Sequence, residues 1–560
     1  MRDGERERDA VSLLGGLCLP HVPRALALMD RDPLSRTYGC MDRTYWYYRT
    51  IANFPGAVWQ QPMVAFAALA RTPHAANPFA NDPALLGAAR AALLAWTRAQ
   101  HGNGAFDEWY RNEFSYCPTA ITTAGAVVTL DLLADAVEPA VRAQALEAAR
   151  RAGRWLSVRY NPEVMNQNLA SAVALAGLAR LDEDPRWHVR ATGLLQRIAA
   201  DQTEEGWFPE YDGFDFGYST LALDFLALIG RFGFSELADP MADRLARSLL
   251  DVLTAGGAVP GHLGSRGTGH AFPFGALELS ARLPHAGALA HLLLRLHASG
   301  LAAGPAGVDD RYFAYFYFPA FCLAYHAAAR IPAPAVAAAE TRAEVAWARS
   351  GLAVWRTGGA SVVVNRRLGG ATALLRVGVP ALYHLGYTVT IGKRRYSSAA
   401  WSRLNARHTV DADRARSTAQ FAAVSSAIPL RWFTLPFQLV VHALVSGRLA
   451  EAFQALVKRI MITRSRPIGL VLERRVTFAG QQLLLEDTLR PARPLAVDAT
   501  AVTRQPSMYS PSARQDHSAS VELGAEAQAA VRDAIRAGHA IGLRWTIQLE
   551  TGQAEVRITR

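Results

Sequence analysis

Two kinds of hydrophobic pattern alternate between residues 59 and 331. One kind of segment is amphipathic and carries several charges, and the other kind is apolar on every side. The amphipathic segments are residues 83–100, 137–159, 185–202, 236–254 and 287–299. The apolar segments are residues 60–69, 119–133, 169–181, 220–229, 272–283 and 318–329. A helix that is apolar all round is buried, and an amphipathic helix covers it, so the alternation predicts an α/α toroid over residues 59–331.

The hydrophobic period changes after this region. Residues 332–347 begin with Pro332-Ala333-Pro334 and are predicted to be a linker. Short alternating segments separated by glycines follow, which predicts an antiparallel β-sandwich over residues 348–560. Residues 1–58 become dense in aromatic side chains and arginine towards their end, and we expect them to form a lid over the mouth of the toroid.

A polar or aromatic segment recurs about every 50 residues, each time just before an apolar helix. Its members include Tyr116, Asn168, Tyr218, His270 and Tyr317, which are separated by 52, 50, 52 and 47 positions. A fixed period of this length marks the repeat of one supersecondary unit. Inner helices that run in the same direction start at the same end of a ring. The period therefore predicts one polar cleft that these residues share.

Two short motifs, together with this architecture, carry a resemblance to a known family. Asn166-Gln167-Asn168 opens one apolar helix, and Gly217-Tyr218-Ser219 opens the next. A toroid with these motifs, followed by a β-sandwich, resembles the heparinase II/III-like polysaccharide lyases. The resemblance implies an enzyme that cleaves an acidic, uronate-containing polysaccharide by β-elimination. The family usually has His after the first Asn, where this chain has Gln167.

Elimination across C4 and C5 of a uronic acid requires the substrate carboxylate to be neutralised, which an amide or a guanidinium can do. A base must then remove the C5 proton, and an acid must protonate the leaving oxygen. We expect Asn166 or Asn168 to bind the carboxylate and Tyr218 to act as base and acid, with a pKa lowered by neighbouring arginines. His270 is expected to be a second proton-transfer group or to orient Tyr218.

Arginine and aromatic side chains near the predicted mouth are candidates for binding acidic groups and sugar rings. These candidates are Arg43, Tyr45, Arg111, Asn112, Tyr116, Tyr211, Arg266 and Tyr315. A purely structural interpretation stays open. An asparagine at a helix start is commonly an N-cap, a tyrosine there commonly packs, and the predicted lid fits a packed segment without a ligand equally well.

The net charge of +11 comes almost entirely from arginine, because Lys393 and Lys458 are the only lysines. Arginine suits an acidic polymer, although a GC-rich genome would also enrich arginine and alanine. The arginines are dispersed and accompany no nucleic-acid motif, so we expect no nucleic-acid partner. The four cysteines lack metal-ligand spacing, and we expect neither a metal nor another cofactor.

Residues 428–462 interrupt the β pattern with an aromatic cluster and a helical stretch that ends close to Lys458 and Arg459. A basic amphipathic insertion of this kind predicts contact with an anionic membrane surface. The alternative is an ordinary helix packed on the toroid. The N-terminus is a poor secretory signal, and no apolar run reaches the roughly 18 residues of a membrane span. We therefore expect a cytoplasmic protein, peripheral to the inner membrane face if the insertion binds there.

Two other functions fit the same sequence. A uronate C5-epimerase, or another glycan-modifying enzyme of polysaccharide biosynthesis, begins with the same proton abstraction. A non-catalytic glycan-binding scaffold is favoured by Gln167 in place of the family histidine.

Overall fold

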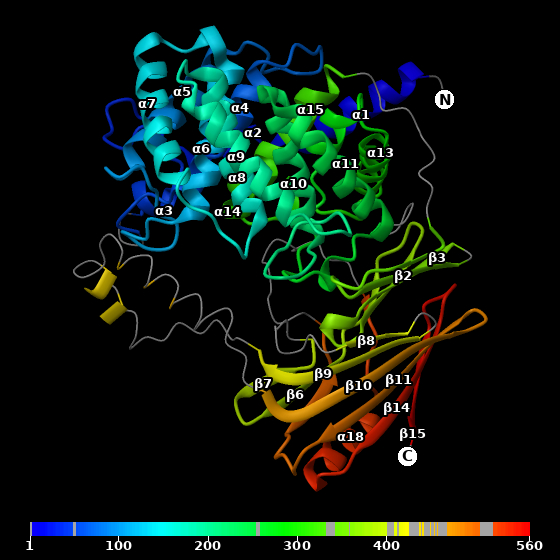
Figure 1. Ribbon diagram of the computed structural model, residues 1–560. Helices are drawn as coiled ribbons and strands as arrows, with labels where there is room; N and C mark the ends of the chain where they lie inside the picture. The colour runs from blue at the N-terminus through cyan, green and yellow to red at the C-terminus, as the bar shows by residue number, and fades with distance from the viewer. Residues whose placement is uncertain are drawn as a thin grey trace.

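The computed structural model consists of a helical domain and a β domain (Figure 1). It describes residues 3–48, 52–253, 258–331, 342–357, 359–399, 408–411, 414–424, 467–504 and 519–559. Between residues 425 and 466 it describes only residues 436, 437, 439–441, 449, 453 and 456. The side chains of residues 3–9 and 408–414 are outside the description.

Six apolar helices form the inner ring of the helical domain. They are α4 (Pro62–Ala70), α6 (Tyr116–Leu133), α8 (Met165–Leu181), α10 (Phe216–Ile229), α12 (Phe274–Leu279) and α15 (Phe318–Ala328). Each helix contacts the next, and α15 contacts α4, so the ring closes. Most of their side chains are buried, as expected for helices that are apolar on every side. The predicted toroid is confirmed.

Amphipathic helices cover this ring from outside. Five of them come from the predicted segments: α5 (Pro83–Ala99), α7 (Pro139–Leu156), α9 (Arg186–Asp201), α11 (Ser235–Val252) and α13 (Pro284–Ala298). Helix α1 (Asp3–Cys18) packs on α15 and touches α13, which makes it the sixth outer helix (Figure 1).

The position of α1 corrects the expectation that residues 1–58 form a lid. Val11, Leu14 and Cys18 of α1 are buried in the core of the toroid. Gly15 lets α1 come close to α15, since a Cβ atom there would lie 3.2 Å from Cε2 of Tyr325. The N-terminal segment therefore starts as part of the toroid wall. It continues through 3₁₀ turn η1 (Leu19–His21), α2 (Val22–Leu28) and α3 (Arg43–Trp46).

Short helical elements complete this domain. They are η2 (Ala57–Gln60), η3 (Ala134–Ala136), η5 (Gly261–Leu263), η6 (Pro305–Gly307), α14 (Asp310–Tyr312) and two π-helical turns, η4 (Gly230–Phe234) and η7 (Phe313–Tyr317).

Two loops with nearly the same sequence make the same turn in different repeats. Nε2 of Gln100 donates to the carbonyls of Gly104 and Ala148, at 3.1 and 2.8 Å. Nε2 of Gln202 donates to Gly206 and Met241 in the same way, at 2.7 and 2.9 Å. Each glutamine thus ties its own loop to the next outer helix, and Gly104 and Gly206 both have positive φ.

The β domain contains two sheets in the described chain. The first has the strand order β1-β2-β3-β4-β5-β13, antiparallel except for the parallel β5–β13 pair. Its strands are β1 (Glu344–Ala346), β2 (Leu352–Thr357), β3 (Ala360–Asn365), β4 (Ala371–Arg376), β5 (Leu382–His384) and β13 (Ala519–Ser520). The 3₁₀ turn η8 (Arg366–Leu368) joins β3 to β4.

The second sheet has the order β12-β6-β7-β9-β10-β11-β14-β15, with β8 paired to β9. Its strands are β6 (Tyr387–Ile391), β7 (Arg394–Ser397), β8 (His408–Asp411), β9 (Arg414–Ala423), β10 (Pro467–Ala479), β11 (Gln482–Pro491), β12 (Ala499–Val502), β14 (Ile541–Gln548) and β15 (Ala554–Thr559). Helix α18 (Ala525–Ala537) packs on β12, β11 and β14. The predicted antiparallel sandwich is confirmed.

The first sheet is covered on both faces. Val362 and Val364 of β3 belong to the core between the two sheets, whereas Val363 belongs to the core of the toroid. All six residues of β3 are buried. The β domain is therefore packed against the toroid through a continuous apolar layer.

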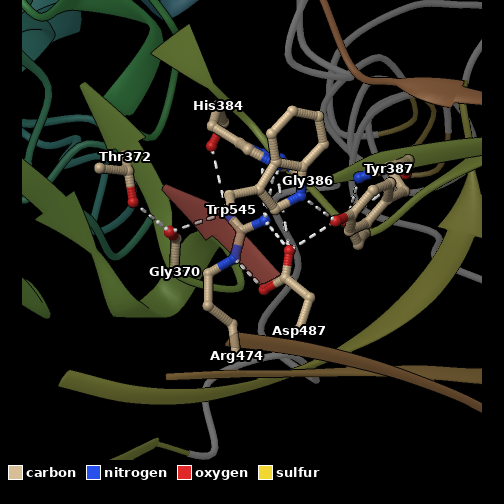
Figure 2. Close-up of polar contacts among 9 residues, drawn as sticks. Gly370, Thr372, His384, Gly386, Tyr387, Arg474, Asp487 and Trp545 are labelled. Atoms are coloured by element: carbon tan, nitrogen blue, oxygen red, sulfur yellow. Dashed lines mark hydrogen bonds and ion pairs between the residues drawn. The ribbon is translucent and has the colours of Figure 1, made fainter. Parts of the chain in front are cut away.

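A buried polar cluster joins the two sheets (Figure 2). The guanidinium of Arg474 on β10 donates to both carboxylate oxygens of Asp487 on β11, each at 2.6 Å. It also donates to the carbonyls of Gly370 and His384 beside the first sheet, at 3.2 and 3.1 Å. The hydroxyl of Tyr387 donates to Asp487 at 2.6 Å. All of the charge is compensated inside the sandwich, which is the condition for burying an ion pair.

Two helical stretches of the described chain have the length and composition of a membrane span, Ala10–Leu28 and Tyr116–Ala136. Both stretches contain polar side chains, so they do not contradict the expectation that no uninterrupted apolar run reaches this length. The second stretch contains core helix α6 and is largely buried, and the first contains α1 and α2 near the N-terminus. The cytoplasmic location stays a prediction.

Most of the predicted insertion at residues 428–462 lies outside the described residues. Among those described, Phe437 and Phe453 contact the ring of Tyr110, with centroids 5.4 and 6.1 Å away. Leu439, Leu449 and Leu456 are exposed.

Candidate functional site

The starts of the inner helices meet at one end of the ring. We call this end, formed by residues 107–118, 160–168, 205–218, 261–272 and 309–317, the rim. The hydroxyl of Tyr116 at the start of α6 donates to Oδ1 of Asn168 on α8, at 3.0 Å. Nδ1 of His270 lies 2.8 Å from the hydroxyl of Tyr317 before α15. These contacts between consecutive units agree with the common phase predicted by the repeat.

A further contact joins the start of α6 to the segment before α15. Sγ of Cys117 at the start of α6 lies 3.2 Å from the hydroxyl of Tyr315. Tyr315 is buried, and burial raises its pKa well above the usual value. Burial also raises the pKa of Tyr116 to about 12. These two predicted binding residues are at the rim as protonated hydroxyls.

The side chain of Asn168 is held by hydrogen bonds with Asn161 of its own loop and with Tyr116. Its Oδ1 accepts from Tyr116 and from the backbone N–H of Asn161, and its Nδ2 donates to the carbonyl of Asn161 at 2.7 Å. The neighbouring Gln167 accepts from Nδ2 of Asn161 at 2.8 Å. Asn168 is fully buried, so its amide fixes the start of α8. This arrangement agrees with the structural interpretation of Asn168.

Asn166 is paired with a carboxyl group that the sequence did not single out. Its backbone N–H and its Nδ2 both donate to Oε1 of Glu210, at 2.9 and 2.8 Å. Oε2 of Glu210 is buried and has no hydrogen-bond partner in the described chain. Burial raises the pKa of Glu210 to about 8, although the bonds from Asn166 oppose the rise. Glu210 is therefore mainly a neutral carboxyl group at pH 7, able to donate a hydrogen bond.

Glu210 opens a tight turn with an unusual backbone. The N–H of Glu210 donates to the carbonyl of Gly213 at 2.9 Å, and the reverse bond is 3.2 Å long. The two central residues, Tyr211 and Asp212, have φ of 51° and 65°. Left-handed backbone is costly for an aromatic residue, on the order of 1–2 kcal/mol. Four of the six non-glycine residues with positive φ in the described chain lie in two rim loops: Asn112, Phe114, Tyr211 and Asp212.

Arg266 and Tyr211 lie together. The guanidinium carbon of Arg266 is 4.7 Å from the centre of the Tyr211 ring. The backbone N–H of Arg266 donates to Oδ2 of Asp215 at 2.9 Å. Both side chains are partly exposed, which leaves the cation–π pair accessible at the rim.

Asp215 organises the start of α10. Its carboxylate accepts from the backbone N–H of Tyr218 at 3.1 Å, as an N-cap does, and from the hydroxyl of Thr268. Gly217 permits this close approach, because a Cβ atom there would lie 2.3 Å from Oγ1 of Thr268. The loop before α12 is thereby clamped to the start of α10. In the sequence, the signal for this N-cap is an Asp three residues before Tyr218, directly ahead of an apolar run.

Tyr218 is partly exposed at the rim, next to Tyr312 and Arg266. Burial raises its pKa well above the usual value, Tyr312 adds to the rise, and Arg266 opposes it. The expected lowering of this pKa by arginines is therefore wrong, because desolvation outweighs the one guanidinium nearby. The hydroxyl of Tyr218 is a proton donor.

His270 lies inside an aromatic cage. Its ring centre is 6.0 Å from that of Tyr218 and 5.2 Å from that of Phe272. Burial lowers the pKa of His270 to about 3, so the ring is neutral. Its Nε2 is buried and has no hydrogen-bond partner in the part of the chain that the structure describes.

Four predicted binding residues come well before Tyr218 in the sequence: Arg111, Asn112, Arg43 and Tyr45. Arg111 is exposed, and the backbone N–H of Asn112 donates to Oδ2 of Asp107 at 2.8 Å. Arg43 and Tyr45 belong to α3, where Arg43 stacks on Tyr47 at 5.1 Å. The indole of Trp46 ties α3 to the carbonyl of Leu28, and Asp42 ahead of α3 accepts from the N–H of Gly56. The next residue, Ala57, donates to the carbonyl of rim residue Asp107 at 3.2 Å. The binding roles of Arg43 and Tyr45 stay a prediction.

A pocket lies among the inner helices of the ring. It is lined mainly by apolar side chains of α4, α6, α10 and α15. Its polar lining includes Gln61, Asp224 and Tyr315. Burial raises the pKa of Asp224 well above the usual value, and the N–H of Gly275, which donates to its Oδ1 at 2.6 Å, opposes the rise. Among the described residues, no group of three or more His, Cys, Asp or Glu side chains is placed to hold a metal ion.

Comparisons with known proteins concern the fold. No protein-family model matches the sequence, and no curated protein matches it. A chondroitin AC lyase of Streptomyces coelicolor A3, solved with chondroitin sulphate, is similar in structure with a TM-score of 0.48 and 13% identity. The match covers 89% of this chain and 67% of that one.

Two further solved structures are similar over most of this chain. A heparan sulfate lyase of Pedobacter heparinus matches with a TM-score of 0.33 and 12% identity, over 79% of this chain and 62% of that one. This chain thus covers less than two thirds of that lyase. A glycoside hydrolase matches with a TM-score of 0.32 and 10% identity, over 90% of this chain and 91% of that one. The described chain itself has a helical toroid followed by an antiparallel β-sandwich.

Proposed function

We propose that this protein is an enzyme that acts on an acidic, uronate-containing polysaccharide and cleaves it by β-elimination. The observation that carries the proposal is the group formed at the rim by Tyr218, Arg266 and the neutral Glu210 paired with Asn166. It combines a proton donor, a fixed positive charge and an uncharged acid, which are the groups that a uronate substrate requires.

The substrate carboxylate would be bound by Arg266 and by the proton on Glu210. A guanidinium and a neutral carboxyl group both withdraw charge from the carboxylate, and this acidifies the C5 proton. Asn166 acts through Glu210, since its amide donates to Oε1. Oε2 has no hydrogen-bond partner in the described chain and is buried, so the substrate would reach it only if the rim opens. This role replaces the direct contact expected for Asn166.

Proton transfer would run through Tyr218 and His270. As the C5 proton moves to the oxygen of Tyr218, the hydroxyl would pass its own proton to Nε2 of His270. This nitrogen has no hydrogen-bond partner in the described chain, so the transfer requires the Tyr218 hydroxyl to move into hydrogen-bonding distance of it. The C5–H electrons form the C4–C5 double bond, and the C4–O bond breaks. The low pKa of His270 means that the proton stays there only briefly before it returns through Tyr218 to the leaving oxygen.

The test is an ultraviolet assay on a panel of acidic polysaccharides that includes alginate, polygalacturonate and chondroitin sulphate. Elimination creates an unsaturated uronate that absorbs in the ultraviolet. Tyr218→Phe should lower turnover by about 100-fold or more, because it removes a proton-transfer group. Tyr325→Phe is the matched control and should keep full turnover, because Tyr325 lies on inner helix α15 of the toroid but outside the rim. Equal turnover in both variants would remove Tyr218 from the mechanism.

A non-catalytic glycan-binding scaffold is the second candidate. The closed hydrogen bonding of Asn168 and the burial of Asn166 favour it, since neither amide is presented to a substrate. A scaffold would bind the polysaccharide without forming the ultraviolet chromophore. A C5-epimerase would also form no chromophore, but it would exchange the C5 hydrogen with deuterium from solvent.

A further inference from the structure

We propose that Arg367, from the β domain, is a positioning residue that holds the turn of residues 210–213 at the rim of the toroid. The inference concerns the site of the proposed function and rests on that proposal for its effect on turnover. Its structural part stands on contacts between the two domains.

The turn needs an external clamp. Tyr211 and Asp212 have φ of 51° and 65°, as the two central residues of a type I′ turn do. Aspartate is common at such positions, but Tyr211 is not the glycine, asparagine or aspartate that usually occupies them. Such a strained backbone persists only where the surroundings fix it. Within the toroid, the N–H of Tyr211 donates to the carbonyl of Glu163 at 2.7 Å, and the hydroxyl of Ser265 donates to the carbonyl of Glu210 at 2.7 Å.

Arg367 supplies the contacts to the second central residue. Its guanidinium donates to Oδ2 of Asp212 at 2.7 Å and to the backbone carbonyl of the same residue. The Arg367 side chain is 7% exposed, so this ion pair is shielded on one side. Charge-assisted, two-point contacts of this kind are stronger and more directional than a single surface ion pair.

The β domain is shaped to deliver this guanidinium. Arg367 lies in η8, where its backbone N–H donates to the capping side chain of Asn365 at 2.9 Å. Nδ2 of Asn365 in turn donates to the carbonyl of Leu263 in the next rim loop, at 2.6 Å. Gly351 leaves room for the arginine stem, because a Cβ atom there would lie 2.8 Å from Cγ of Arg367. One short turn of the β domain thus fixes two loops of the rim.

The consequence for the site follows from what the turn carries. Glu210 precedes Tyr211, and the Tyr211 ring lies against Arg266. Release of the turn would move the neutral carboxyl group and would admit water to it. The β domain therefore controls the geometry of groups that belong to the helical domain.

Hydrogen–deuterium exchange of the full chain, read by mass spectrometry, tests the clamp without a substrate. Arg367→Gln should raise exchange at residues 210–213 by about 10- to 100-fold, because it removes charge-assisted hydrogen bonds. Arg367→Lys should fall between this variant and the unchanged protein. Arg356→Gln is the matched control, because Arg356 also reaches the toroid, through the carbonyl of Asp251 at 2.7 Å, but does not contact the turn.

Unchanged exchange at residues 210–213 in Arg367→Gln, or an equal rise in Arg356→Gln, would overturn the proposal. On a substrate found by the ultraviolet assay, Arg367→Gln should lower kcat by about 10-fold or more and shift the pH profile, with partial rescue by Arg367→Lys. A rise in exchange without any activity in the unchanged protein would support the clamp and contradict the proposed function. Raised exchange with unchanged kcat and pH profile would overturn the positioning role.

Discussion

Burial brings the pKa of Glu210, a rim residue, close to neutral pH. Its pKa is about 8 in the folded protein, compared with 4.5 for an ordinary glutamate. Between these two values the folded state binds more protons than the unfolded state. The stabilisation contributed by Glu210 is therefore fully present below pH 4.5 and is lost as the pH rises towards 8. The free energy of unfolding falls over this range by at most about 1.4 kcal/mol per pH unit because of this group.

Glu210→Gln should remove this slope. The measurement is denaturant unfolding of the variant and the unchanged protein at several values between pH 5 and pH 8. The contribution of Glu210 is the change with pH in the difference between their free energies of unfolding. Glu236→Gln, at an exposed position of α11, is the control and should leave the pH dependence as it was. A slope that survives in Glu210→Gln would show that Glu210 is ionised in the folded state.

The rim residues show which part of a site a sequence can predict. Tyr218, His270 and Tyr317 share a phase of the repeat, and their common location follows from that phase alone. Glu210 carries no such signal, because its partner Asn166 is 44 positions away and its pKa comes from burial. Burial also outweighed the lowering of the Tyr218 pKa by Arg266. Charge in the sequence indicates the sign of an interaction but not the desolvation that competes with it.

At the scale of elements, the periodicity predicted the inner helices and five outer helices. The sixth outer helix, α1, was misjudged because its partner α15 is the last helix of the ring. The strands of the first sheet were recognisable as strands, but the burial of both faces of β3 depends on the toroid. An apolar run such as Val362-Val363-Val364 is what such a doubly covered strand requires.

The buried cluster of Figure 2 predicts an asymmetric response to substitution. Asp487→Asn should destabilise the protein by about 3–5 kcal/mol, since it leaves the guanidinium of Arg474 buried without its counter-charge. Glu486→Gln on the same strand breaks a partly exposed pair with Arg544, and should cost about 1 kcal/mol or less. Thermal or denaturant unfolding checks both. Equal costs would mean that water reaches the Arg474–Asp487 pair.

Contact of residues 428–462 with an anionic membrane stays a prediction. Exposed Leu439, Leu449 and Leu456, in a segment that also contains Lys458 and Arg459, motivate it. The intact protein should float with vesicles that contain anionic lipid at low salt, and Lys458→Glu with Arg459→Glu should weaken this. Vesicles of neutral lipid are the control. No flotation with the anionic vesicles would leave the packed helix as the better interpretation.

At the scale of the whole molecule, the toroid and the first sheet share one core. The ring of Phe214 on the rim meets that of Trp347 edge to face, with centroids 5.8 Å apart, and Val354 and Leu375 of the sheet join the core of the toroid. The full chain should therefore unfold in a single calorimetric transition, because neither part keeps its apolar surface covered without the other. Two well-separated transitions would contradict this coupling.

The packing of α1 on α15 also has a consequence during protein synthesis. About 300 residues separate the end of α1 from the start of α15. At a synthesis rate of about 5–20 residues per second, α1 leaves the ribosome roughly 15 to 60 s before its partner exists. During that interval Leu14 and Cys18 have no surface to cover. The nascent chain thus carries an unsatisfied apolar helix through most of its translation, which makes its first helix a natural place for a chaperone to hold.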